Sequence, residues 1–279
     1  MSLENEAQKE GSRMSSVKRK IVAIGGGECG RMTENGQREP YETAAFDVEI
    51  IMLADKEKPH FLLLAHAQIT NGAEAERGYF ETMRRIYGDL YGCECRHLES
   101  AALFGDPAKI GGYLSWADII YVGGGDTVAM MGLWRRTGFD RKLREAWEDG
   151  KVMCGVSAGA TCWFALGNTD APGFKEKEVN KLVGLGFIDA YFSPHCQCDW
   201  KRDSEISSLK HINKVGLSVS NCSAVEIVGD GYRIIKSAPA DGGSEPYVLR
   251  TYFKNGKLFE EELHETEDLK SLDDLLTMK

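Results

Sequence analysis

The chain has 279 residues, of which 42% are apolar and 28% are charged, and its formal net charge is −9. This composition is typical of a soluble globular protein, and its negative charge argues against a nucleic-acid partner because phosphates would be repelled. No apolar run approaches the ~18 residues that a membrane span needs, and the run Phe61–Ala67 is interrupted by His66.

The N-terminus is polar, mixed in charge and without the apolar segment of a secretory signal. We therefore expect residues 1–18 to form a disordered tail, followed by one α/β domain over 19–265. Residues 266–279 form an acidic C-terminal tail, either helical or frayed. Without export, the location is expected to be cytoplasmic and the cysteines to be thiols.

Short apolar runs alternate with amphipathic stretches through the first part of the chain. The predicted strands are Lys20–Ile24, His60–Ala67, Glu94–Leu98, Asp118–Val122 and Lys151–Val156. The predicted helices are Tyr41–Leu53, Ala73–Tyr87, Pro107–Leu114, Thr127–Trp134 and Arg141–Glu148. This alternation is typical of βαβ units around a parallel sheet that is covered on both faces.

The pattern changes after residue 213, where short strands are separated by turn motifs. These strands are Val215–Ser220, Ala224–Val228, Tyr232–Lys236, Tyr247–Phe253 and Leu258–Leu263. They predict an antiparallel extension, built from hairpins, at the edge of the parallel sheet.

Glycine-rich turns follow three of the predicted parallel strands. They are Gly25–Gly27, Gly123–Gly125 and the segment from Gly155 to Gly159. Ligands of open α/β sheets bind beyond the carboxyl ends of the strands. The three turns therefore predict a functional site at this one edge of the sheet.

The segment Val152–Phe164 contains the motif G-x-S-x-G between an apolar strand and a helical pattern. This order is that of a nucleophile elbow, which lifts a serine to a helix N-terminus. Ser157 is the candidate nucleophile, although a serine that only caps a helix would give the same pattern. The backbone N–H of Ala158 is then a candidate oxyanion donor.

The motif YVGGGDT follows the fourth predicted strand and supplies the second candidate donor. Gly124 or Gly125 can present a backbone N–H to a ligand because neither carries a Cβ. Asp126 or Thr127 is suited to cap the following helix. Asp126 is also a candidate substrate-binding residue.

An activated serine needs a general base within hydrogen-bond reach. His195 follows a short apolar run and a proline, and it is the first histidine after the elbow; His66 is its competitor. Asp170 is the candidate triad acid, although it could equally form a turn. Other candidate acids are Glu176, Glu178 and Glu226.

Two further patterns are weak. Gly25, Gly27 and Gly30 match G-x-G-x-x-G, but a loop follows them instead of a helix, so no dinucleotide site is expected. Cys93 and Cys95, with Cys196 and Cys198, have C-x-C spacing that differs from the usual zinc knuckle. We expect neither a metal nor a cofactor.

The motifs GGGDT, GVSAGA and PH, in this order, resemble the serine peptidases that include peptidase E and cyanophycinase. The resemblance spans roughly residues 20–235, and the order Ser157, Asp170, His195 is similar to that of peptidase E. It implies a three-layer α/β sandwich with a mostly parallel, flavodoxin-like sheet, like that of class I glutamine amidotransferases. It also implies cofactor-free hydrolysis of a peptide bond. Because the elbow lies among loops and not in an obvious open groove, we expect the substrate to be a short peptide; a homodimer is left open.

The specificity residues of these relatives are not matched. Peptidase E carries an arginine for the substrate aspartate in the loop that corresponds to Gly216–Ser220, and this loop contains none. Cyanophycinase has several arginines after its histidine, where this chain has only Lys201 and Arg202. Arg202 is the candidate substrate-binding cation, and we expect a poor aspartyl dipeptidase. An esterase or amidase with the same triad, or a non-catalytic binding relative, remains an alternative.

Overall fold

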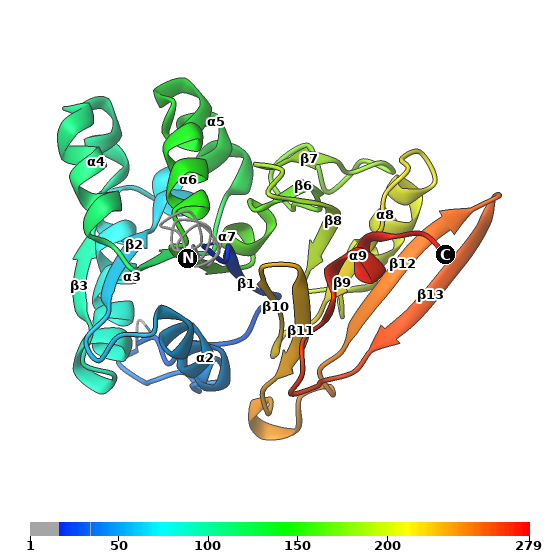
Figure 1. Cartoon of the computed structure of the whole chain (residues 1–279), viewed down its shortest axis with the longest axis horizontal. Coiled ribbons are helices and arrows are strands. Elements are labelled where there is room, and N and C mark those ends of the chain that lie inside the picture. Colours follow the sequence, from blue (N-terminus) through cyan, green and yellow to red (C-terminus); the bar gives the residue numbers. More distant parts are fainter. Residues whose placement is uncertain (1–16, 34) are drawn as a thin grey trace, which may run out of the picture.

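The structure is a computed structural model, and it describes residues 17–33 and 35–279 of the chain. The predicted N-terminal tail therefore lies outside the described residues up to residue 16. In the described part, two mixed β-sheets lie next to each other, with helices around the larger one (Figure 1).

The larger sheet has eight strands in the order β14-β11-β10-β1-β5-β4-β2-β3. Its parallel part consists of β1 (Lys20–Ile24), β5 (Val152–Val156), β4 (Ile119–Val122), β2 (His60–Leu64) and β3 (Glu94–His97). All five predicted parallel strands are thus confirmed, although β2 ends before His66. From the β3 edge inward, the parallel strands lie in the order β3-β2-β4-β5-β1. This matches the order 2-1-3-4-5 of a flavodoxin-like sheet if β2, β3, β4 and β5 are taken as its first four strands and β1 as its fifth.

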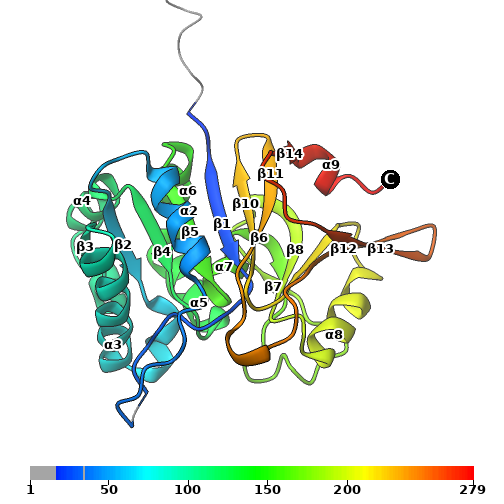
Figure 2. The same ribbon diagram turned by 90° about the horizontal axis from the view of Figure 1, so that it is seen from below.

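Helices cover both faces of this parallel part, because its four inner strands β1, β5, β4 and β2 are apolar on both sides (Figure 2). Val22 and Ile24 of β1 face the core that contains α2, whereas Ile21 and Ala23 face the core that contains Trp134 of α5. The helices on the α2 side are α2 (Ala44–Ala54) and α3 (Ala73–Met83), which continues into a π-helical turn, η2 (Arg84–Leu90). The other face carries α4 (Pro107–Trp116), α5 (Thr127–Thr137) and α6 (Phe139–Glu148). Two 3₁₀ turns, η1 (His66–Asn71) and η3 (Ser100–Phe104), follow β2 and β3.

The second sheet has six strands in the order β13-β12-β9-β8-β6-β7. Its strands are β6 (Phe164–Gly167), β7 (Leu182–Val183), β8 (Ile188–Pro194), β9 (Gly216–Val219), β12 (Val248–Lys254) and β13 (Lys257–Leu263). The helix α8 (Asp199–Leu209) connects β8 to β9, and a 3₁₀ turn, η4 (Ala240–Gly242), precedes β12.

The predicted antiparallel extension is therefore divided between two sheets, which corrects the expectation of one. Of the predicted hairpin strands, only β10 (Ser223–Val228) and β11 (Gly231–Lys236) extend the parallel sheet, whereas β9, β12 and β13 belong to the second sheet. The reason is that the elbow helix α7 (Ala158–Thr161) has only four residues, after which the chain starts β6 in a new sheet.

The acidic C-terminal segment is partly ordered on this fold. It forms β14 (Lys270–Ser271), which pairs with β11, and α9 (Leu272–Leu276), in which Leu275 is buried. Of the two sequence-based alternatives, the structure has the helix.

Within residues 17–33 and 35–279, none of the helices combines the length and apolar character that a bilayer crossing requires. The two sheets meet where β5 of the larger sheet and β8 of the second sheet end near each other. The residues after these two strands are Ser157 and His195.

Candidate active site

Ser157 lies in a sharp turn between β5 and α7. Its backbone has φ 56° and ψ −111°, a conformation that residues with a Cβ rarely adopt. The flanking glycines permit this turn, since a Cβ on Gly155 or Gly159 would lie 2.5 Å or 1.9 Å from the carbonyl oxygen of Val122. The sequence around Ser157 thus has the strand–serine–helix geometry of an elbow.

His195 follows β8 and faces this serine from the other sheet. Its Nε2 lies 2.9 Å from Ser157 Oγ. Its backbone also has a positive φ of 52°, and its N–H donates to the carbonyl oxygen of Gly25 at 3.3 Å. The structure therefore brings together the two residues that the sequence singles out as nucleophile and base.

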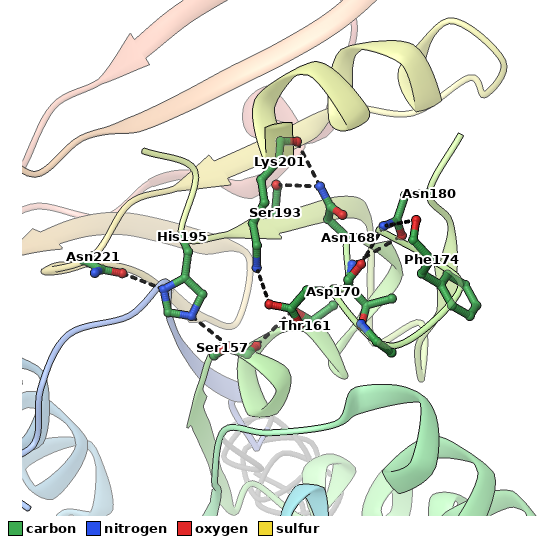
Figure 3. A network of polar contacts seen from close by, with 12 residues as sticks. Ser157, Thr161, Asn168, Asp170, Phe174, Asn180, Ser193, His195, Lys201 and Asn221 are labelled. Atoms are coloured by element: carbon green, nitrogen blue, oxygen red, sulfur yellow. Dashed lines mark hydrogen bonds and ion pairs between the residues drawn. The ribbon is translucent and has the colours of Figure 1, made fainter. Parts of the chain in front are cut away.

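The other imidazole nitrogen of His195 is bonded to an asparagine that sequence analysis missed. His195 Nδ1 lies 2.6 Å from Asn221 Oδ1, and Figure 3 shows Asn221, His195 and Ser157 in a continuous chain. Because an amide oxygen only accepts, Nδ1 carries the proton and Nε2 is free to accept from the Ser157 hydroxyl. The Asn221 backbone N–H donates to Gln197 Oε1 at 3.1 Å, which helps to fix the residue.

The glycine-rich loop after β1 packs against the side chains of His195 and Asn221. A Cβ on Gly26 would lie 2.1 Å from Asn221 Oδ1 and 2.5 Å from His195 Nδ1. The backbone of the loop therefore packs directly against the hydrogen bond between the two side chains. Gly26 is missed by sequence analysis as a site residue, although its loop is singled out.

The surroundings of His195 favour its neutral form. Burial is the largest cause that lowers the pKa of His195 below its usual value, and the nearby Lys201 ammonium lowers it further. The hydrogen bond to Asn221 and the charge of Asp170 act in the opposite direction on this pKa. A neutral imidazole can accept the serine proton, as a general base must.

Asp170 does not contact the imidazole. Its carboxylate lies 3.4 Å from Lys201 Nζ, and its side chain is 60% exposed. The position behind His195 that we expected Asp170 to occupy is held by Asn221 (Figure 3). The physical reason is that the buried Lys201 ammonium attracts the carboxylate.

The other candidate acids lie elsewhere. Glu176 and Glu178 are exposed, and Glu226 is buried beneath Arg233, 2.9 Å from its Nε. None of the three forms a hydrogen bond to His195 within the part of the chain that the structure describes.

Arg202 points into the second sheet and away from the serine. Its guanidinium donates to Ser218 Oγ and Thr251 Oγ1, each at 3.0 Å. It also pairs with the carboxylates of Glu205 and Glu260. The expectation that Arg202 binds substrate is therefore not supported by its position, because its charge is already compensated by two acids.

The loop after β4 lies against the nucleophile. A Cβ on Gly124 would lie 3.6 Å from Ser157 Cβ. The N–H of Gly124 is engaged by Tyr79 Oη at 3.2 Å. Among the described residues, the N–H groups of Gly125 and Ala158 have no hydrogen-bond acceptor, so they are the stronger oxyanion candidates.

Asp126 caps α5 rather than facing a substrate. Its Oδ1 accepts from the N–H of Ala129 at 2.9 Å, which is the cap role that the sequence also allowed. His66 is a buried core residue that accepts from Trp134 Nε1 and contacts the carbonyl oxygen of Leu98. Burial lowers the pKa of His66 to about 3, so it is a structural residue and not a base.

The four cysteines with C-x-C spacing do not form one cluster. Cys93 and Cys95 lie at the edge strand β3, and Cys196 and Cys198 follow β8 in the other sheet. Over residues 17–33 and 35–279, no group of three or more His, Cys, Asp or Glu side chains is arranged to hold a metal ion.

Two small hollows border the site. One, of about 240 Å³, is lined by residues that include Gln197, Asn221 and Cys222. The other, of about 290 Å³, is lined by residues that include Gln68 and Tyr79. Both volumes lie just below the ~300–1,000 Å³ of pockets that take drug-sized ligands.

Known proteins resemble this chain in sequence and in fold. Residues 32–235 match the profile of Peptidase family S51. Over 180 residues the chain is 33% identical to the uncharacterized peptidase YgaJ of Bacillus subtilis (strain 168), covering 63% of this chain and 68% of that protein.

Two solved structures share the fold. One is a peptidase from an acI-B1 Actinobacterium, with a TM-score of 0.68, 18% identity and coverage of 92% of this chain and 98% of that one. The other is a proposed peptidase E protein from Listeria monocytogenes EGD-e, with a TM-score of 0.54, 16% identity and coverage of 79% and 100%.

Proposed function

This chain belongs to peptidase family S51, and we propose that it hydrolyses short peptides with Ser157 as nucleophile, His195 as base and Asn221 as the residue that orients the base. The observation that carries the proposal is the chain of two hydrogen bonds through the imidazole. Ser157 Oγ lies 2.9 Å from Nε2, and Asn221 Oδ1 lies 2.6 Å from Nδ1.

In the first half of the reaction, Ser157 Oγ attacks the scissile carbonyl carbon while His195 Nε2 takes the hydroxyl proton. The carbonyl oxygen becomes an oxyanion, which the N–H groups of Ala158 and Gly125 stabilise. His195 then gives the proton to the amine nitrogen, the C–N bond breaks, and an acyl-serine remains. A water molecule, deprotonated by His195, releases the acid and restores Ser157.

Asn221 holds the imidazole without adding a negative charge. Its oxygen keeps the proton on Nδ1, which is the tautomer that leaves Nε2 basic. A carboxylate in this position would also stabilise the imidazolium, and an amide does so less. The site therefore combines a fixed tautomer with a pKa of His195 below the usual value.

The charges beside the site favour neutral peptides. Lys201 is the basic side chain close enough to His195 to affect its pKa, and its charge is compensated by Asp170. A substrate carboxylate that loses its water needs a cation in exchange, and Arg202 is occupied by Glu205 and Glu260. A peptide with an N-terminal aspartate is thus expected to be a poor substrate.

The test is a screen of dipeptides for cleavage, with Ser157→Ala as control. We expect Ala-Leu and Ser-Leu to be cleaved in preference to Asp-Leu, and Ser157→Ala to be inactive on all of them. A clear preference for Asp-Leu would contradict the substrate assignment. Turnover of small esters without turnover of any peptide would contradict the peptidase assignment.

A further inference from the structure

We propose that Gln68 is a positioning residue for the oxyanion hole, because it fixes the direction of the peptide group between Gly124 and Gly125. The inference rests on the proposed acyl-transfer function of Ser157. It concerns a residue on η1, after β2, that the elbow and the GGGDT motif do not include.

Gln68 contacts the carbonyl of Gly124 through its side-chain amide. Its Nε2 donates to Gly124 O at 2.6 Å. Its Oε1 accepts from Asn71 Nδ2 at 2.8 Å, so the amide oxygen is already engaged on the other side. Because Asn71 binds the amide oxygen of Gln68, the amide NH₂ of Gln68 faces the loop after β4 and can only donate to it.

The direction of one peptide group follows from this contact. Among the described residues there is no cis peptide bond, and in a trans peptide the C=O and the next N–H point in opposite directions. Since Gly124 C=O points at Gln68, the N–H of Gly125 points away from Gln68. Gly124 contacts Gln68 through this carbonyl, and a Cβ placed on its Cα would lie 3.6 Å from Ser157 Cβ, so the same residue adjoins both Gln68 and the nucleophile. The free N–H is therefore turned to the side of the nucleophile.

Gly125 itself is held so that it cannot rotate away. It has φ 140°, and a Cβ there would lie 2.4 Å from the carbonyl oxygen of Ala67. The N–H of Asp126 donates to that same carbonyl at 2.8 Å. The backbone of η1 and the loop after β4 are thus joined at two adjacent positions, 67 and 68.

Tyr79 completes the clamp from α3. Its hydroxyl oxygen accepts from the Gly124 N–H at 3.2 Å, and its ring packs against Gly123. Gln68 and Tyr79 therefore bind the two sides of one residue, Gly124, and both line the hollow of about 290 Å³ next to it. Loss of the Gln68 contact allows the peptide group between Gly124 and Gly125 to turn, and loss of the Tyr79 contact releases the preceding peptide group and with it Gly124. In both cases the oxyanion loses a preorganised donor.

The test compares Gln68→Leu and Gln68→Glu with the wild type on a cleaved dipeptide. The glutamate variant has the same shape, but it presents an acceptor to the Gly124 carbonyl. We expect kcat to fall about 10- to 100-fold in both, since one oxyanion donor is worth about 10²- to 10³-fold. KM should change less than about twofold, because the donor acts on the transition state. Gln37→Leu, in the loop before α2, is the matched control and should keep wild-type kcat.

A second measurement separates positioning from folding. A peptide aldehyde forms a hemiacetal with Ser157 whose oxygen occupies the oxyanion position, whereas the product amino acid does not. The affinity for the aldehyde should fall by the same factor as kcat in Gln68→Glu and Tyr79→Phe, with product affinity and melting temperature unchanged. Wild-type kcat and wild-type aldehyde affinity in either Gln68 variant would overturn the inference. Failure of the proposed function would instead be seen as full activity in Ser157→Ala.

Discussion

Replacing Asn221 with aspartate tests how the imidazole is used. The change keeps the shape of the side chain and adds a negative charge where Oδ1 lies 2.6 Å from His195 Nδ1. The wild-type pKa of His195 lies below its usual value, chiefly because of burial. We therefore expect wild-type kcat/KM to persist to a lower pH than for an ordinary histidine.

The expected size of the effect follows from the geometry. Opposite unit charges about 4 Å apart attract by about 4 kcal/mol at an effective dielectric constant of about 20. This energy corresponds to about 3 pH units at about 1.4 kcal/mol per unit. Desolvation of the new carboxylate offsets part of it, so the acid limb should move upward by about 1 to 3 pH units in Asn221→Asp.

The assay is the pH dependence of kcat/KM between pH 4 and pH 9 on a neutral dipeptide. Asn221→Ala is the companion variant, and it should lose about 10²-fold in kcat because the imidazole tautomer is no longer fixed. An acid limb of Asn221→Asp that coincides with that of the wild type would refute the contact between residue 221 and the imidazole. Asp170→Asn should move the limb downward, because the charge of Asp170 raises the pKa of His195; a downward movement larger than the upward one in Asn221→Asp would refute the contact as well.

Three more substitutions test other parts of the account. Gly26→Ala should abolish activity, because the alanine Cβ would lie 2.1 Å from Asn221 Oδ1. Its control is Gly111→Ala, which should keep activity because a Cβ there meets no atom within 4 Å. The kcat of each variant is compared with that of the wild type. Asp170→Asn should keep most of the activity on Ala-Leu. It should increase the turnover of Asp-Leu relative to Ala-Leu, because the substitution leaves the charge of Lys201 uncompensated. A loss of activity of about 10³-fold or more on both dipeptides would restore Asp170 as the triad acid. Asp47→Asn should remove a pH dependence of stability, because burial raises the pKa of Asp47 to about 6 from its usual 3.8. Because the Asp47 carboxyl binds its proton more tightly in the folded than in the unfolded protein, it contributes about 3 kcal/mol to the free energy of unfolding below about pH 4. This contribution is lost as the pH rises through about 6. Urea unfolding of the wild type and of Asp47→Asn across this pH range measures it.

The parallel part of the fold was predictable because its four inner strands are buried on both faces. The segments Ile21–Ile24 and Ile119–Val122 are continuous apolar runs, and the turns after them are marked by glycine. Such local patterns also indicated Ser157 and His195, since each directly follows a strand. The second sheet was not predictable in this way, because β6 follows a helix of only four residues and starts a separate sheet by pairing with β7 and β8 instead of joining the parallel one.

Asn221 could not be identified from local patterns for a different reason. It lies 26 residues after His195, and α8 and β9 stand between the two residues in the chain. An amide is also not the residue type that one seeks behind a catalytic histidine. The rule that sites of α/β sheets lie beyond the carboxyl ends of the strands would have indicated Asn221. It stands just beyond the end of β9, as Ser157 stands beyond the end of β5. Asp170 was favoured by its acidity, whereas the charge of a buried lysine decides where it lies.

The most direct test of the account is covalent labelling of the native protein with a fluorophosphonate, followed by mass mapping of the adduct. An activated serine reacts with this probe, whereas an ordinary helix-capping serine does not. We predict a single adduct on Ser157, absent in Ser157→Ala and strongly slowed in His195→Ala. An unlabelled wild-type protein, or an adduct on another serine, would contradict the assignment of Ser157 as the nucleophile.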